Sequence, residues 1–449
     1  SFLKATTTTA LGVSAALPQV MTAYAQEMDA KPNIILIMAD DFGYECIGAN
    51  GGTSYETPVL DSLAEAGVRF QHCYAQPLCT PSRVQIMTGK YNVRNYKDFG
   101  LLPSSETTFA HRLKQAGYAT CVAGKWQLGS EKDSPQHFGF DEALLWQHTR
   151  RGRLRKNGVR YDKRYENPLL EHNGVEKSFT NGEYGPDLVT DFICDFIEDN
   201  KDEPFFVYYP MILTHRPFVP TPDSEKWNPR SQGSRKRKGN PKYFGDMVTY
   251  VDTLVGRINN ELVEQGISEN TIIMFTGDNG TDRAIVSTLK GREIAGGKGK
   301  TTDAGTRVPL IVSCPGLVRP GVINDLVDFT DFLPTICDLA GVDLSSDSLH
   351  LDGRSFLPQL RGREGNPREY VYCWYSRDGK DKTASVFART HRYKLYRNGD
   401  FFDIPNDPHE TSPLGNDSLT PEQMAAKKKL QRVIEKYDST EASETRKAP

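Results

Sequence analysis

The sequence predicts an α/β fold, in which a large, mostly parallel sheet is sandwiched by helices and a smaller antiparallel-sheet subdomain follows. Two observations predict the large sheet: apolar runs too continuous for half-exposed strands recur along the chain, and amphipathic helical patterns lie between them. A third predicts the subdomain. After about residue 345, short strand-like runs are separated closely by turn residues, which is typical of antiparallel hairpins.

The apolar runs are the predicted buried strands of the large sheet. They are "NIILIMADD" (33–41), "YATCVAGKW" (118–126), "PFFVYYPM" (204–211), "TIIMFTGDNG" (271–280) and "VPLIVSCPG" (308–316). Helices are expected from Thr57-Pro58 to Gly67, at 187–199 and at 244–266, because apolar residues recur there at helical spacing. In the subdomain the predicted strands are 370–376, 384–390, 392–398 and 401–404, with a final helix at 421–437.

Composition is that of an ordinary globular protein. The chain has 449 residues, a net charge of −3 and 37% hydrophobic residues, so no overall basic field points to nucleic acid. No apolar run reaches the length of a membrane span. Eight cysteines without a CxxC pair fit neither a disulfide scaffold nor a zinc site. We expect a catalytic α/β domain at 31–344 and an α+β subdomain at 345–449.

Residues 1–25 differ from the remainder. They are rich in Ala and Thr, carry no acidic residue and end in Ala23-Tyr24-Ala25, an A-x-A processing pattern. The opening Ser-Phe-Leu-Lys resembles the tail of a twin-arginine export signal. We interpret the segment as a bacterial export signal, with a disordered leader as the alternative, and therefore expect a periplasmic or secreted protein.

Polar side chains follow four of the apolar runs, each where the run ends. The carboxyl ends of parallel strands meet at one edge of a sheet, and open α/β sheets bind their ligands there, so we expect one site. Its members are Asp40 and Asp41 after the first run, Lys125 after the second, His215 four residues beyond the third, and Asp278 and Asn279 in the fourth.

The chemistry of this edge indicates a cation beside an anion. Asp40, Asp41, Asp278 and Asn279 offer only oxygen ligands, which suit Ca²⁺ or Mg²⁺ and not zinc. Any one of these pairs taken alone is equally consistent with a helix cap or a solvated turn.

Three basic residues complete the predicted anion site. Arg83, Lys125 and Lys298 suit an oxyanion, so the edge predicts a tetrahedral sulfate or phosphate group. Lys298 lies in the glycine-rich "GGKGKTTDAGTRVP" (296–309), which matches neither the Walker nor the G-x-G-x-x-G nucleotide pattern.

The stretch "CTPSRVQIMTGK" (79–90) carries an unusual cysteine. Pro81 suits the first position of a helix, Thr80 its cap and Gly89 its end, so Cys79 is expected just outside a helix N-terminus, where the backbone favours an anion. Arg83 follows one helical turn later. A buried structural thiol and a disulfide with Cys73 are the alternatives for Cys79.

This stretch resembles the signature of the formylglycine-dependent sulfatases, within the alkaline phosphatase superfamily. "PNIILIMADD", "GKWQLG", "FTGDNG", "GGKGKTTDAGTRVP" and "FFDIPNDPHE" resemble further blocks of that family in the family's order, so the resemblance extends from residue 31 to about 415. It implies a sulfatase matured by a formylglycine-generating enzyme, which oxidises Cys79 to an aldehyde. One hydroxyl of the hydrated aldehyde would attack sulfur, and the second would expel the bound sulfate by hemiacetal collapse.

The resemblance also implies roles for single residues. By this resemblance, one Ca²⁺ is bound by Asp40, Asp41, Asp278, Asn279 and the group formed from Cys79. Arg83 holds the hydrate, and Lys125 and Lys298 bind sulfate oxygens. His215 protonates the leaving alcohol. Taken by itself, His215 would be read as a helix-cap or core histidine.

One departure concerns Gln127. The family usually reads G-K-W-H-L-G, with a histidine assigned to proton transfer during sulfate release, and a glutamine is no base at neutral pH. We therefore expect Gln127 to orient the hydrate or a substrate hydroxyl. His137 and His148, in the following loop, are candidates for a replacement base.

The substrate is less well defined by the sequence. The basic segments 148–165 and 234–239 fit subsites for a sulfated glycan, or else solvated loops. Sulfate-ester hydrolysis on a polysaccharide or oligosaccharide, or on aryl sulfates, is the favoured function. The alternatives are a phosphonate or phosphodiester hydrolase of the same superfamily and, because of Gln127, a weakly catalytic glycan-binding protein.

Overall fold

The computed structural model describes residues 31–149, 155–156, 159–160, 163–231, 238–345 and 349–439. The predicted export signal lies outside this range, as do parts of both basic segments. From Pro32 onward the chain forms one compact unit, and the domain boundary at 344/345 stays a prediction. None of the described helices combines the length and apolar character needed to cross a membrane.

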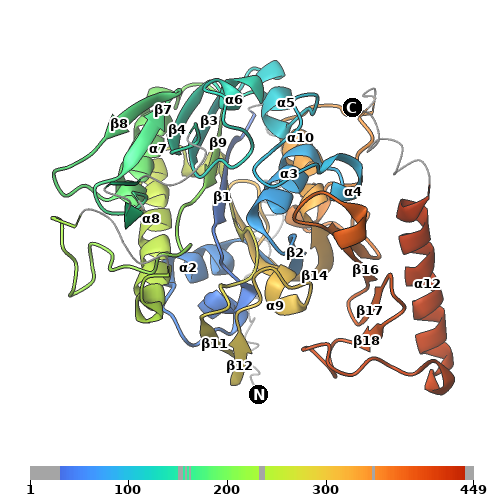
Figure 1. The fold of residues 1–449 in the computed structure, drawn as a ribbon. Helices are drawn as coiled ribbons and strands as arrows, with labels where there is room; N and C mark the ends of the chain where they lie inside the picture. The colour runs from blue at the N-terminus through green and yellow to red at the C-terminus, as the bar shows by residue number, and fades with distance from the viewer. Residues whose placement is uncertain are drawn as a thin grey trace, which may run out of the picture. The chain divides into compact units, whose positions relative to one another are not determined.

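A ten-stranded sheet, counted over the described residues, runs through the centre of this unit (Figure 1). Its order is β14-β2-β13-β10-β1-β9-β3-β4-β7-β8. The strands are β1 (Asn33–Ala39), β2 (Val68–Tyr74), β3 (Ala119–Gly124), β4 (Glu142–Trp146), β7 (Leu169–His172), β8 (Val175–Ser178), β9 (Phe205–Pro210), β10 (Thr271–Gly277), β13 (Arg307–Ser313) and β14 (Gly321–Asp328).

The centre of the sheet is parallel, as predicted. β10, β1, β9, β3 and β4 all run in the same direction. β13 was predicted among the buried strands and is one, but it pairs antiparallel with β10 and β2. The chain leaves β10 at its carboxyl end and re-enters the sheet at the same edge, so β13 must return in the opposite direction. The glycine-rich segment with Lys298 lies in this connection and is therefore kept at that edge.

Helices cover both faces of the sheet, and the alternation of side chains along β1 shows why (Figure 1). Ile34, Leu36 and Met38 pack in one apolar cluster with α3, α5 and α10, whereas Ile35 and Ile37 point to the other face and pack with α2, α7 and α8. A strand buried on both faces needs a continuous apolar run. The helices are α2 (Pro58–Ala66), α3 (Cys79–Thr88), α5 (Phe109–Gln115), α7 (Gly185–Asp199), α8 (Phe244–Glu264) and α10 (Phe332–Leu339).

The predicted C-terminal hairpins form a separate antiparallel sheet, four-stranded over the described residues, in the order β15-β16-β17-β18. α12 packs on β16 and β17, and the short helix α4 packs against β15. The elements are β15 (Val371–Tyr375), β16 (Ser385–Arg389), β17 (Tyr393–Tyr396), β18 (Phe401–Asp403), α12 (Pro421–Asp438) and α4 (Asn92–Asn95).

The shorter described elements lie in the connections. They are the hairpins β5 (Arg155–Lys156) with β6 (Val159–Arg160) and β11 (Val286–Leu289) with β12 (Arg292–Ala295), the short helices α6 (Ser134–His137), α9 (Asp303–Thr306) and α11 (Leu357–Leu360), and the 3₁₀ turns η1 (Tyr44–Cys46), η2 (Gly48–Asn50), η3 (Pro241–Tyr243), η4 (Ser268–Asn270), η5 (Phe329–Asp331), η6 (Asp381–Thr383) and η7 (Asn416–Ser418).

Candidate active site

Four parallel strands bring the predicted polar residues to one edge of the sheet. β10, β1, β9 and β3 are consecutive neighbours, and the candidate residues follow their carboxyl ends. Asp40 and Asp41 follow β1, Asp278 and Asn279 follow β10, and Lys125 follows β3. His215 lies five residues beyond the last residue of β9. The structure therefore places all six side chains on the edge expected from the sequence.

Cys79 is the first residue of α3, which corrects one expectation. The helix was predicted to begin at Pro81 with Thr80 as its cap, but it begins at Cys79 and its N-cap is Leu78, which offers no capping side chain. Ser82 stabilises this start instead, because its hydroxyl donates to the carbonyl oxygens of Leu78 and Gln76. The predicted C-terminal glycine is correct: Gly89 adopts the left-handed conformation, with φ of 66°.

The thiol of Cys79 is buried at this helix N-terminus. Burial raises its pKa, while Lys125 and Lys298 act in the opposite direction, so both lysines lie within electrostatic reach of the sulfur. Cys79 and Cys73 are both free thiols, so the structure contradicts the alternative of a disulfide between them.

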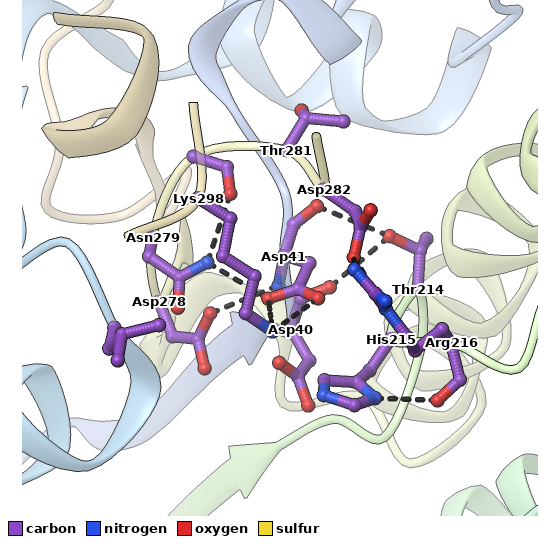
Figure 2. A network of polar contacts seen from close by, with 12 residues as sticks. Asp40, Asp41, Thr214, His215, Arg216, Asp278, Asn279, Thr281, Asp282 and Lys298 are labelled. Carbon is purple, nitrogen blue, oxygen red and sulfur yellow. Dashed lines mark hydrogen bonds and ion pairs between the residues drawn. The ribbon is translucent and has the colours of Figure 1, made fainter. Parts of the chain in front are cut away.

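Asp41 is the centre of the acidic cluster (Figure 2). Its carboxylate accepts a hydrogen bond from Asn279 at 2.9 Å and one from Lys298 at 2.6 Å, while its backbone N–H donates to Asp278 at 3.0 Å. Thr214 fixes the backbone here, since its hydroxyl donates to the carbonyl oxygen of Asp40. Asp41 has a φ of 58°, a left-handed conformation that costs a non-glycine residue about 1 kcal/mol or more and that persists where packing enforces it.

The cluster has the donor set of a hard-cation site. Asp40 Oδ1 and Asn279 Oδ1 are buried acceptors to which no described group donates a hydrogen bond. Ligand atoms of Asp40, Asp41 and His215 also lie within 4.8 Å of one another. Burial raises the pKa of Asp40, and Asp278 adds to the shift, because both disfavour the negative charge of this carboxylate. Carboxylate and amide oxygens with free lone pairs fit Ca²⁺.

Three basic side chains lie beside these acids. Arg83 is fully buried and donates to the carbonyl oxygen of Lys125 at 2.7 Å and to Asp278 at 3.2 Å. Lys125 donates to Asp40 at 2.5 Å. Burial by itself would lower the pKa of Lys298, but the negative charges of Asp41 and Asp40 outweigh this effect and raise the pKa. All three therefore present positive charge next to Cys79, as the sequence predicted.

His215 is oriented by two residues that the sequence reasoning missed. Tyr165 donates from its hydroxyl to the carbonyl oxygen of His215, and Arg164 lies over the ring of Trp146 with its guanidinium 2.7 Å from Nδ1 of His215. Burial and the nearby lysines 298 and 125 hold the pKa of His215 well below its usual range. Arg164 belongs to the basic segment 148–165. This run of basic residues was the only feature of the sequence that pointed to Arg164.

Gln127 lies two residues beyond Lys125 in a left-handed conformation, with φ of 59°. Its carboxamide oxygen is buried and accepts no hydrogen bond from the described part of the chain. The two histidines considered as replacement bases are engaged elsewhere. His137 Nε2 lies 2.8 Å from the carbonyl oxygen of Ser104, and His148 forms a fully buried pair with Glu171 at 2.9 Å. The structure thus gives neither histidine a contact with the site.

The C-terminal sheet holds the loop that carries Lys298. Lys394, on β17, is fully buried and donates to the carbonyl oxygen of Thr301 at 2.5 Å and to Glu410 at 2.8 Å. Arg389, on β16, pairs with Asp303 in the same loop. Glu410 belongs to the quoted block "FFDIPNDPHE", but nothing in the sequence linked that block to Lys298.

Comparison with known proteins covers residues 32–438. The family profile described as Sulfatase matches residues 32–342, and the profile described as N-sulphoglucosamine sulphohydrolase, C-terminal, matches residues 298–438. Human arylsulfatase A is 33% identical over 396 residues, which are 81% of this chain and 74% of that protein. Mouse N-acetylgalactosamine-6-sulfatase is 32% identical over 363 residues, 73% of this chain and 66% of that protein.

A solved structure, Ps i-CgsB in complex with k-i-k-neocarrahexaose, superposes with a TM-score of 0.73 at 28% identity, covering 91% of this chain and 93% of that one. The fold, the site geometry and these matches agree over almost the full described length. The chain therefore belongs to the sulfatase family and is a sulfuric ester hydrolase.

Proposed function

We propose that this sulfatase hydrolyses sulfate esters on glycans by means of a formylglycine formed from Cys79, with one Ca²⁺ bound beside it. The observation that carries the proposal is the position of Cys79, at the N-terminus of α3 and within electrostatic reach of Lys125, Lys298, Asp278 and Asp40. When formed, the hydrated aldehyde supplies the oxygen that attacks sulfur and a second hydroxyl through which sulfate is released.

The surrounding residues supply binding and charge. Lys125 and Lys298 bind sulfate oxygens, because their ammonium groups lie within electrostatic reach of Cys79 and their charge matches the sulfate. Arg83 donates to Asp278 and to the backbone of Lys125, and so fixes the end of β10 relative to that of β3. Asp40, Asp41, Asp278, Asn279 and the Cys79-derived group would hold Ca²⁺, which would add positive charge beside the sulfate.

His215 protonates the leaving alcohol, for which the negative charge of the bound sulfate must raise its pKa, lowered here by burial and by Lys298 and Lys125. One of its ring nitrogens lies within 4.8 Å of ligand atoms of Asp40 and Asp41, so the ring faces the sulfate site. Tyr165 holds its backbone, and Nδ1 lies 2.6 Å from the carbonyl oxygen of Arg216 and 2.7 Å from the guanidinium of Arg164, which leaves Nε2 for the leaving oxygen (Figure 2).

Two observations support a glycan substrate. The relatives include an N-acetylgalactosamine-6-sulfatase and a structure holding k-i-k-neocarrahexaose. Arg164 of the basic segment 148–165 also lies against His215 and the aromatic ring of Trp146, and aromatic rings and arginines suit a sulfated sugar. The export pattern at residues 1–25 would bring the enzyme to the periplasm or beyond, where such polymers occur.

Mass spectrometry of the peptide containing Cys79 tests the nucleophile. Protein produced together with a formylglycine-generating enzyme should carry an aldehyde in place of the thiol, and Cys79→Ala should lose turnover of 4-nitrophenyl sulfate and of sulfated oligosaccharides. The variant Cys194→Ala, at a half-buried cysteine on α7, is the matched control and should stay active. Wild-type turnover by Cys79→Ala would end the proposal.

The phosphonate or phosphodiester alternative is separated by leaving-group-matched assays. With 4-nitrophenyl sulfate, 4-nitrophenyl phosphate and a 4-nitrophenyl phosphonate, the sulfate should have the highest kcat/KM. A weakly catalytic glycan-binding protein would instead bind sulfated oligosaccharides without releasing sulfate, even when the aldehyde has formed.

A further inference from the structure

Two exposed arginines, Arg283 and Arg377, belong to segments that contact the residues next to Cys79 at the start of α3. Arg283 follows the β10 segment, and its Nε donates to the carbonyl oxygen of Lys298 at 2.7 Å. The next residue, Gly299, donates from its backbone to the carbonyl oxygen of Pro77 at 2.8 Å, two residues before Cys79. These contacts tie Arg283 to the chain that enters α3.

Arg377 approaches from the C-terminal sheet. Its guanidinium lies over the ring of Phe99, 5.1 Å from the centroid, and its carbonyl oxygen accepts from the hydroxyl of Tyr96 at 3.0 Å. Gly100, next to Phe99, donates to the side chain of Thr80 at 3.2 Å, one residue after Cys79. The packing of α4 against β15 keeps these two segments together.

Tyr375 connects the two sides. It ends β15, two residues before Arg377, and is half-buried. Burial raises its pKa to about 12, and Arg377, Cys79 and Arg283 all contribute to its electrostatic environment. The side chain therefore lies within electrostatic reach of both guanidinium groups and of the cysteine.

Nearby acids do not neutralise the two arginines. Neither arginine forms an ion pair with any residue in the described ranges. The carboxylate of Asp98 accepts from the backbone of Phe99, Asp282 is paired with Arg216, and Asp378 accepts from Ser376 and Thr383 in its own turn. Two exposed guanidinium groups without an acidic partner among the described residues, both on segments that contact the start of α3, favour a second anion on the ligand.

We propose that Arg283 and Arg377, with Phe99 and Tyr375, form a subsite that recognises a second sulfate or carboxylate on the same substrate. The preferred substrate is then a sugar with at least two anionic groups, one of which is the ester that is cleaved. This inference rests on the proposed sulfatase function and narrows its substrate class.

The test compares two sugars that differ by one anion, glucosamine 6-O-sulfate and glucosamine 2-N,6-O-disulfate. Each is measured as an inhibitor of 4-nitrophenyl sulfate hydrolysis, and the readout is the ratio of the two inhibition constants. The wild type should bind the disulfate about fivefold or more tightly than the monosulfate, and high salt should reduce the ratio. Arg377→Gln should lower this ratio, and Arg283→Gln with Arg377→Gln should bring it close to one.

Arg432→Gln, at an exposed arginine on α12, is the matched control and should keep the wild-type ratio. Arg283 contacts the backbone of Lys298, so its substitution could also slow the hydrolysis of 4-nitrophenyl sulfate. Such a loss of rate affects both sugars equally and leaves the ratio of their inhibition constants unchanged. A wild type without preference for the disulfate, or a double variant that retains the preference, would overturn the inference. If the mature wild type cleaves no sulfate ester, the proposed function fails instead, and calorimetric titration of both sugars into Cys79→Ser protein still measures the ratio.

Discussion

Lys298 donates a hydrogen bond of 2.6 Å to Asp41, although the two residues are 257 positions apart in the chain. Asp41 follows β1 by two residues, and Lys298 lies in the connection between β10 and β13. The loop is fixed from two directions: the backbone of Lys298 donates to Thr281, and Lys394 and Arg389 of the C-terminal sheet hold Thr301 and Asp303. The position of one ammonium group at the sulfate site thus depends on a sheet that supplies none of the proposed catalytic side chains.

The variant Lys394→Met should therefore slow the enzyme through Lys298. Removing the ammonium group frees the carbonyl oxygen of Thr301 and leaves the buried Glu410 with only the hydroxyl of Tyr396 as a partner. Displacement of a positioned charge lowers kcat by about 10- to 100-fold. In the Lys298→Ala background the same substitution should cost little further kcat, because the group it positions is already absent. The measurement is a double-mutant cycle on 4-nitrophenyl sulfate turnover.

A second buried ion pair provides the control for that cycle. Arg368 and Asp331 are both almost fully buried and do not contact the Lys298 loop. Arg368→Met should lower the melting temperature comparably but should change kcat equally in the two backgrounds. Full additivity of Lys394→Met with Lys298→Ala would show that Lys394 has a structural role alone.

Removal of Ca²⁺ should lower stability as well as activity. A ligand that binds only the folded state stabilises it by about 2.7 kcal/mol at a hundred times its Kd, so chelation should lower the melting temperature and added Ca²⁺ should restore it. The inactive Cys79→Ala protein allows this shift to be measured without turnover. Asp40→Asn should reduce the response to Ca²⁺, whereas Asp187→Asn, on α7, should retain it. Stoichiometric zinc in elemental analysis would contradict the all-oxygen site.

Gln127 should affect substrate preference more than the attack on sulfur. General-base assistance contributes about 10²- to 10⁴-fold, which a carboxamide cannot supply, and neither His137 nor His148 contacts the site. Gln127→Ala should therefore reduce turnover of sulfated oligosaccharides more than that of 4-nitrophenyl sulfate, and Gln127→His should raise the rate of sulfate release. Both variants are measured on both substrate types. An unchanged rate and preference in Gln127→Ala would make the residue a spectator.

Acidification should destabilise the protein in part through His72. Burial lowers the pKa of His72 to about 3, and Arg307 and Arg389 add to the shift, whereas the unfolded chain binds that proton near pH 6.5. Between these two pH values the unfolded state therefore binds more protons than the folded state. The free energy of unfolding decreases as the pH falls from about 6.5 to 3. His72→Gln should flatten this part of the pH–stability curve in urea titrations. His172→Gln, at an exposed histidine, should leave the slope unchanged.

The fold, and the gathering of polar residues at one edge of its sheet, could be predicted because both depend on local patterns. Continuous apolar runs such as 33–39 are needed wherever a strand is buried on both faces, and a polar residue directly after such a strand can only lie at its carboxyl edge. The stretch 79–90 likewise marked Cys79 as the proposed nucleophile, through its resemblance to the family signature, and its cysteine, proline and arginine lie on one helix.

Other features depended on contacts between distant segments, which no local pattern encodes. The start of α3 at Cys79 is set by Ser82 contacting the preceding turn and not by the proline rule. The support of Lys298 by Lys394 and the contact of Arg164 with His215 each join segments more than fifty residues apart. By itself the sequence determined which strands are buried and which residues end them. The tertiary structure alone decided what holds those residues in place, because a buried charge takes its partner from whichever segment packs against it.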